Sequence, residues 1–170
     1  KIKPLKAILS LYTWAFRGTP LLLQLFFTYF GLPVIGIRLS PLAAASLAFT
    51  INYAAYLAEI FRAGIESIDK GQFEAAKALG MNYYETITRI IIPQAIRNVL
   101  PAVCNESINL VKDSALVATI GVGDLLRAAK EVVTRDFTIT PFFIAAALYL
   151  LITSVLVIGF RQLEKKYSVK

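Results

Sequence analysis

Long apolar runs separated by short polar segments dominate the sequence. A helix rises 1.5 Å per residue, so crossing a hydrocarbon core about 30 Å thick takes about 20 residues. Four runs approach or exceed that length: residues 19–37, 41–61, 91–111 and 141–160. The pattern therefore predicts an all-α, polytopic membrane protein with four transmembrane helices, of which Pro93 and Pro101 should bend the third.

Hydroxyl residues followed by proline mark three of the predicted helix starts. A Ser or Thr side chain can cap a helix, and proline suits the first helical position. The three pairs are Thr19-Pro20, Ser40-Pro41 and Thr140-Pro141. We expect the first span to end or kink at Pro33 and Gly36, because neither residue favours a continuing helix.

Two further apolar segments are too short to cross the membrane. Residues 5–16 carry Tyr12, Trp14 and Phe16, and such aromatic side chains favour the membrane–water interface. Residues 114–126 are apolar but short, so we expect either a re-entrant segment or a short helix buried among others.

Composition and charge agree with a membrane protein and indicate its orientation. Of the 170 residues, 57% are hydrophobic and only 17% are charged, which is more apolar than an average soluble domain. With four spans, thirteen of the eighteen Lys and Arg residues fall on one side. The other side holds Arg38, Lys112, Arg127, Lys130 and Arg135. Because basic residues favour the cytoplasmic side, we expect both ends of the chain and residues 62–97 in the cytoplasm.

The polar segment after the second span has an amphipathic pattern. Apolar residues recur there at steps of about three or four, as on one face of a helix. They are Phe73, Ala76, Gly80, Tyr83, Tyr84, Ile87 and Ile91. Asn82 is followed three residues later by Glu85, a capping pattern, so a second short helix should begin after a bend at Gly80-Met81. The pair is either a rigid cytoplasmic projection or a surface helix packed on its own membrane domain.

Residues 74–93 resemble the EAA loop of bacterial ABC importer permeases. The family pattern is EAA-x3-G-x9-I-x-L-P, and the chain departs from it only at Ile92, where leucine is usual. Three blocks, in the family's order, resemble polar amino-acid permeases: RGTPLLLQLFFTYFGLP (17–33), AYLAEIFRAGIESIDKGQFEAAKALG (55–80) and NLVKDSALVATIGVGDLL (109–126). The chain is thus similar to the membrane permease subunit of a bacterial polar amino-acid ABC importer.

The resemblance implies a fold and a set of partners. The family has five helices with an extracellular N-terminus, so residues 1–170 would be a single transmembrane permease domain without the first helix. The EAA loop, about residues 62–92, would fit a groove on a separate ATPase subunit. The implied coupling residues are Glu74, Ala75, Ala76, Gly80 and Met81. The other implied partners are a second permease subunit, identical or related, and an extracytoplasmic solute-binding protein.

The chain is expected not to be an enzyme. It has no G-x-x-x-x-G-K-[ST] loop to hold phosphates, so ATP and magnesium would bind the partner ATPase, and we expect no cofactor in this chain. It has no histidine, a lone Cys104, and no set of residues typical of a catalytic or metal site. The basic charge is explained by cytoplasmic loops and gives no reason to expect nucleic acid.

Ionisable groups inside apolar runs mark the candidate substrate site, because such groups are costly at membrane depth. Glu106, Asn109 and Asp113 stand at i, i+3 and i+7, on one face of a helix. Glu106 has no basic neighbour within one turn, so a cationic substrate could supply its partner. The alternatives for Glu106 are a helix–helix hydrogen bond or a protonated buried acid. Asp113 could instead pair with Lys112 or cap the next segment.

Other polar residues in the spans leave two interpretations open. Gln24 and Asn52 could line the pathway or bond across helices. Glu59 and Arg62, at i and i+3, favour a local salt bridge.

The sequence therefore predicts a multi-pass subunit of the bacterial plasma membrane that imports a polar amino acid by alternating access. A basic substrate, arginine, lysine or histidine, is favoured by Glu106. The alternatives are a neutral or acidic amino acid, or an ion-coupled secondary transporter with Glu106 and Asp113 as its ion site.

Overall fold

The computed structural model describes residues 3–167, and helices form nearly all of this part of the chain. No strand occurs among these residues, which confirms the all-α prediction. The elements in chain order are α1 (Lys3–Gly18), α2 (Leu21–Phe26), η1 (Phe27–Gly31), η2 (Leu32–Ile35), α3 (Pro41–Glu66), α4 (Lys70–Ala78), α5 (Tyr83–Thr86), η3 (Ile87–Ile91), α6 (Ile92–Asp113), η4 (Ser114–Ile120), α7 (Leu125–Asp136) and α8 (Thr140–Tyr167).

Helices α3 and α8 are long and apolar enough to cross a membrane. The start of α3 is as predicted: Ser40 caps it by accepting a hydrogen bond from the Ala43 N–H, and Pro41 occupies the first turn. Helix α1 and the segment from Leu21 to Ile35 meet at 102° and together could form a third span. Helix α6 corresponds to the remaining predicted span, but it is too polar to be recognised by composition among the described helices.

The first predicted span differs from expectation because its helix is short and irregular. Helix α2 begins at Leu21, and Pro20 is its extended N-cap residue rather than its first helical residue. The Thr19 hydroxyl donates to the Ala15 carbonyl at 2.9 Å, so it closes α1 instead of capping α2. A π-helical segment and a 3₁₀ turn follow, and Gly36 ends them with a φ of 87°. The predicted ending at Gly36 is therefore confirmed, whereas the predicted cap at Thr19 is wrong.

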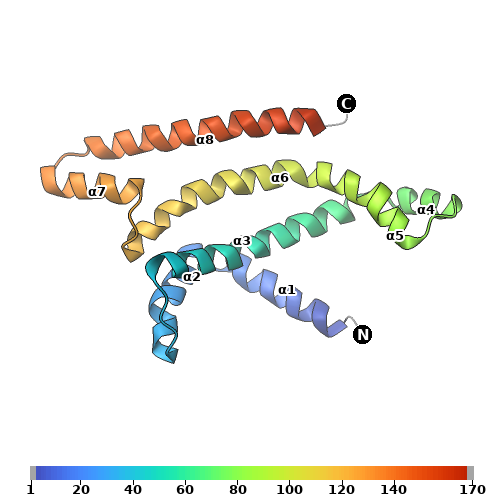
Figure 1. The fold of residues 1–170 in the computed structure, drawn as a ribbon, viewed down its shortest axis with the longest axis horizontal. Helices are drawn as coiled ribbons and strands as arrows, with labels where there is room; N and C mark the ends of the chain where they lie inside the picture. The colour runs from blue at the N-terminus through green and yellow to red at the C-terminus, as the bar shows by residue number, and fades with distance from the viewer. Residues whose placement is uncertain (1–2, 168–170) are drawn as a thin grey trace.

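The two prolines of α6 have different effects. Pro93 is the second residue of α6 and directly follows the π-helical segment η3, through which the helix of α5 continues into α6. Pro101 lies inside the helix, which nevertheless continues to Asp113. In Figure 1, α6 runs as one helix alongside α3 and α8.

The ends of the elements fall into two groups (Figure 1). Helix α1 begins and α8 ends on the side where α4 and α5 project, whereas α7 and the start of α3 lie at the opposite end. A core of Leu25, Ala45, Ala48 and Ile120 joins α2, α3 and η4 at that opposite end. A second core, of Ile68, Ile91 and Ala95, packs the segment that carries α4 and α5 against the start of α6.

The segment at 114–126 forms a short 3₁₀ helix, of which only Ile120 is buried, followed by a turn. Gly121 adopts a left-handed φ of 86° and ends η4. Asp124 then caps α7 by accepting hydrogen bonds from two backbone N–H groups, and the Tyr149 hydroxyl also donates to it. The sequence analysis did not predict α7.

Candidate functional site

A cavity of about 670 Å³ opens where the bend between α1 and α2 meets α3 and α6. A volume of this size is typical of small-molecule sites. Residues from three separate stretches line it: Arg17, Gly18, Thr19, Pro20 and Leu21 from the bend, Asn52, Tyr53 and Tyr56 from α3, and Glu106, Asn109, Lys112 and Asp113 from α6.

The three α6 residues selected by helical spacing all line this cavity. Asp113 accepts a hydrogen bond from the Tyr53 hydroxyl at 2.8 Å. It makes no ion pair with Lys112 and does not cap η4 within the described chain, so neither predicted alternative occurs. Within residues 3–167, Glu106 forms no hydrogen bond and no ion pair, so its carboxylate is the unpaired acid of the cavity.

Gln24 and Asn52 are bonded to each other across helices. The Asn52 amide donates to Gln24 Oε1 at 3.1 Å and to the Phe16 carbonyl at 3.0 Å. The Gln24 amide donates to the same carbonyl at 2.9 Å and to Thr19. Asn52 lines the cavity, but Gln24 lies behind it and is not part of the lining. Of the five predicted substrate residues, four therefore meet at the cavity.

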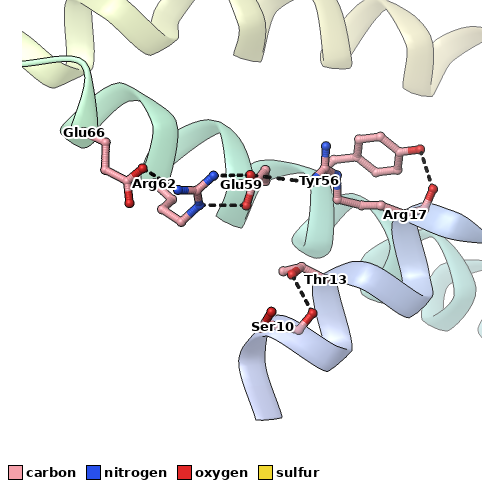
Figure 2. Close-up of polar contacts among 7 residues, drawn as sticks. All are labelled: Ser10, Thr13, Arg17, Tyr56, Glu59, Arg62 and Glu66. Atoms are coloured by element: carbon pink, nitrogen blue, oxygen red, sulfur yellow. Dashed lines mark hydrogen bonds and ion pairs between the residues drawn. The ribbon is translucent and has the colours of Figure 1, made fainter. Parts of the chain in front are cut away.

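A chain of charges runs from the cavity along α3 (Figure 2). Arg62 hydrogen-bonds to Glu59, at 2.9 Å for the Nε atom, and also to Glu66, which confirms the predicted Glu59–Arg62 pair. Arg17 reaches the same Glu59 at a longer 3.7 Å and lies 5.5 Å from the centre of the Tyr56 ring.

Arg17 and Lys112 also line the cavity, and the sequence analysis did not select either as a site residue. The signal for Arg17 was its position at the start of the RGTP block, directly before a helix break. Together with Glu106 and Asp113, these residues give the cavity two basic and two acidic side chains.

The EAA loop has the predicted first helix and bend, but its second helix is not short: α5 continues through η3 into α6. Gly80 adopts a left-handed φ of 75° between α4 and α5. Asn82 and Glu85 form a full capping box at the start of α5. Ala76 is fully buried and Met81 half-buried, whereas Glu74 and Ala75 are exposed.

The predicted apolar face of the EAA loop is correct only for its inner residues. Phe73, Ile87 and Ile91 pack in the core at the base of α6. Tyr83 and Tyr84 are 79% and 75% exposed, and so is Leu79 beside the Gly80 bend, at 79%. The loop thus packs partly on its own domain and presents an apolar surface of Leu79, Tyr83 and Tyr84, here called the outer surface of the EAA loop.

Comparison with known proteins shows which class of protein has this arrangement. Residues 2–169 match the family described as binding-protein-dependent transport system inner membrane components. An arginine transport system permease protein of Bacillus subtilis is 43% identical, over 96% of this chain and 76% of its own. A putative glutamine transport system permease protein of Rickettsia felis is 41% identical, over 99% and 78%.

Two solved structures of ABC transporters have the same fold as this chain. A crystal structure of an amino acid ABC transporter with histidines superposes with a TM-score of 0.92 at 42% identity, covering 98% of this chain and 78% of that one. The methionine ABC transporter MetNI shares the fold, with a TM-score of 0.81 at 19% identity, over 99% of this chain and 78% of that one.

The fold and these matches define a multi-pass permease subunit of the bacterial inner membrane. The chain belongs to the family of inner membrane components of binding-protein-dependent transport systems. The resemblance to the permeases of amino-acid ABC importers, drawn from three sequence blocks, is confirmed. As a transport subunit, it belongs to a class that works with ATPase and binding-protein partners.

Proposed function

We propose that this permease imports basic amino acids, and that the cavity between α1, α3 and α6 is where the substrate binds during transport. The observation that carries the proposal is the free carboxylate of Glu106 in that cavity. A charge held at membrane depth without a protein partner is costly, and the ammonium or guanidinium group of a bound substrate would offset that cost.

The other charges of the cavity suit the common part of an amino acid. Arg17 and Lys112 are basic groups for an α-carboxylate, while Asp113, held by Tyr53, is an acceptor for an α-amino group. This leaves Glu106 for the side chain of the substrate, which is the part that differs between amino acids. A relative named for arginine transport agrees with a basic substrate, whereas relatives named for glutamine and L-cystine favour a neutral one.

The outer surface of the EAA loop is the proposed contact with the ATPase subunit. Three large exposed apolar side chains around a glycine bend are typical of a protein–protein contact. ATP and magnesium would then bind only the ATPase, while Glu74, Ala75, Ala76, Gly80 and Met81 would couple hydrolysis to this chain. A second permease subunit and a solute-binding protein would complete the importer, with the EAA loop and both chain ends in the cytoplasm.

Uptake by the reconstituted complex tests the substrate class. Vesicles holding the complete transporter would be given labelled arginine, lysine, histidine, glutamine or glutamate. We expect Glu106→Gln to lower arginine and lysine uptake about tenfold or more, because removing one partner of a buried pair costs at least ~1.4 kcal/mol, a factor of ten. Glu131→Gln, an exposed acid on α7, is the control. Preference of the unaltered transporter for glutamine or glutamate, or normal arginine uptake by Glu106→Gln, would contradict a basic substrate.

A further inference from the structure

Gly64 of α3 and Val99 of α6 form a close contact between the two helices. Both residues are buried, and a methyl group added to Gly64 would overlap the Val99 Cγ1 atom. The same methyl group would also lie 3.5 Å from the Ala95 carbonyl oxygen. Valine strongly prefers one side-chain rotamer in a helix, so Val99 cannot turn away at low cost. Only glycine therefore fits at position 64 at this helix separation.

Polar contacts hold the two helices together directly beside this point. The Asn98 amide donates to the Ser67 hydroxyl at 2.9 Å, and that hydroxyl donates to the Gly64 carbonyl at 2.8 Å. We refer to Gly64, Ser67, Asn98 and Val99 as the clamp. One turn further on, the core of Ile68, Ile91 and Ala95 continues the contact into the EAA loop.

Away from the clamp, residues of both helices line the cavity. Val99 and Glu106 are seven residues apart on α6, or roughly 10 Å along the helix. Among hydrogen bonds between side chains of the described residues, only that from Tyr53 to Asp113 joins α3 to α6 in this region. The clamp is therefore a close contact between α3 and α6 that lies between the projecting helices α4 and α5 and the residues that line the cavity.

We infer that Gly64 and Val99 are positioning residues that make α3, α6 and the EAA loop move as one rigid unit. When the EAA loop is displaced, Glu106 and Asp113 then move with it, because α3 and α6 do not slide past each other. The inference rests on the proposed contact of the EAA loop with the ATPase. In this role the clamp contacts neither the substrate nor the ATPase.

The experiment uses the complete transporter in proteoliposomes and measures amino acid transported per ATP hydrolysed. We expect Gly64→Ala to lower this ratio about tenfold, the effect of ~1.4 kcal/mol on an equilibrium, because the helices must separate. Adding Val99→Ala should restore the ratio to within about twofold, because the space left by the valine accepts the new methyl group. The matched control is Gly159→Ala on α8, where an added methyl group meets no atom within 4 Å.

The outcomes separate this inference from the proposed function. Normal coupling in an assembled Gly64→Ala transporter overturns the inference, and so does failure of Val99→Ala to restore coupling. If Gly64→Ala prevents assembly, Asn98→Ala is tested instead. We expect it to lower the amount of amino acid transported per ATP about fivefold, because one hydrogen bond is lost. An unchanged ratio overturns the inference. Gly80→Pro in the EAA loop is the reference variant. If Gly80→Pro leaves coupling intact, the proposed ATPase contact is wrong, and the inference that rests on it is wrong too. If coupling is lost in Gly80→Pro but not in Gly64→Ala, only the role of the clamp is refuted.

Discussion

The buried side-chain amides of Gln24 and Asn52 stabilise the backbone at the bend between α1 and α2. Their hydrogen bonds converge on the Phe16 carbonyl and on Thr19, at the end of α1 where backbone acceptors lack helical partners. The two side chains therefore stabilise the bend between α1 and α2, and that bend supplies five residues to the cavity lining.

We expect Gln24→Leu to destabilise the protein and not to change substrate preference. The substitution leaves the Asn52 amide without one of its two partners, and a buried group without its hydrogen bond costs about 1–3 kcal/mol. The midpoint of thermal unfolding of the purified transporter should fall, while Gln162→Leu on exposed α8 should have little effect. An unchanged midpoint combined with an altered KM would instead make Gln24 a residue of the pathway.

Residue by residue, the sequence predicted what lies on one helix and missed what lies between helices. Spacing alone put Glu106, Asn109 and Asp113 on one face of α6, and all three line the cavity. The partner of Asp113 is Tyr53, sixty residues away. No periodicity within one helix reports such a contact, so the sequence suggests only local alternatives for Asp113, pairing with Lys112 or capping the next segment. Whether the five predicted residues bind substrate stays a prediction.

At the scale of elements, the EAA loop combines a buried base with an exposed tip. The base is fixed by packing on α6, and the tip by the Gly80 bend and the capping box. The sequence predicted the first helix, the bend and the start of the second helix from these local signals. It did not predict that Tyr83 and Tyr84 face outward, because a helical pattern does not show which side the rest of the protein covers.

We expect Leu79→Arg to weaken binding of the ATPase subunit. Leu79 is 79% exposed on the outer surface of the EAA loop, so a charge there disturbs little within this chain but must be desolvated in an apolar contact. Co-purification of the ATPase with the permease in detergent measures the effect. Lys77→Ala, an exposed change on the same helix, is the control. Undiminished ATPase recovery with Leu79→Arg would argue against this surface as the contact.

Local signals also explain which elements the sequence predicted correctly. Ser40-Pro41 started α3 as expected. Thr19-Pro20 has the same chemistry, but the Thr19 hydroxyl is used by the preceding turn of α1, a competition that the pair alone does not reveal. Helix α7 has a cap at Asp124, but its mixed charged sequence lacks the long apolar run that predicts a span.

At the scale of the molecule, the arrangement of the helices agrees with the distribution of charge. The start of α1, the end of α8 and the EAA loop lie toward one end, and α7 lies toward the other (Figure 1). Most Lys and Arg residues belong to the first group, and the basic residues of α7 belong to the second. The preference of basic residues for the cytoplasmic side supports the proposed orientation, with the EAA loop in the cytoplasm.

Cysteine labelling of intact cells tests this orientation with a matched pair of positions. After Cys104, the one cysteine of the chain, is replaced, single cysteines are placed at the exposed residues Lys77 on α4 and Lys130 on α7. A membrane-impermeant thiol reagent added outside should label Lys130→Cys and leave Lys77→Cys unmodified until the membrane is opened. The second step also shows that Lys77→Cys is accessible. Labelling of Lys77→Cys in intact cells would place the EAA loop outside, where no ATP-hydrolysing partner could reach it, and would refute both the orientation and the proposed coupling.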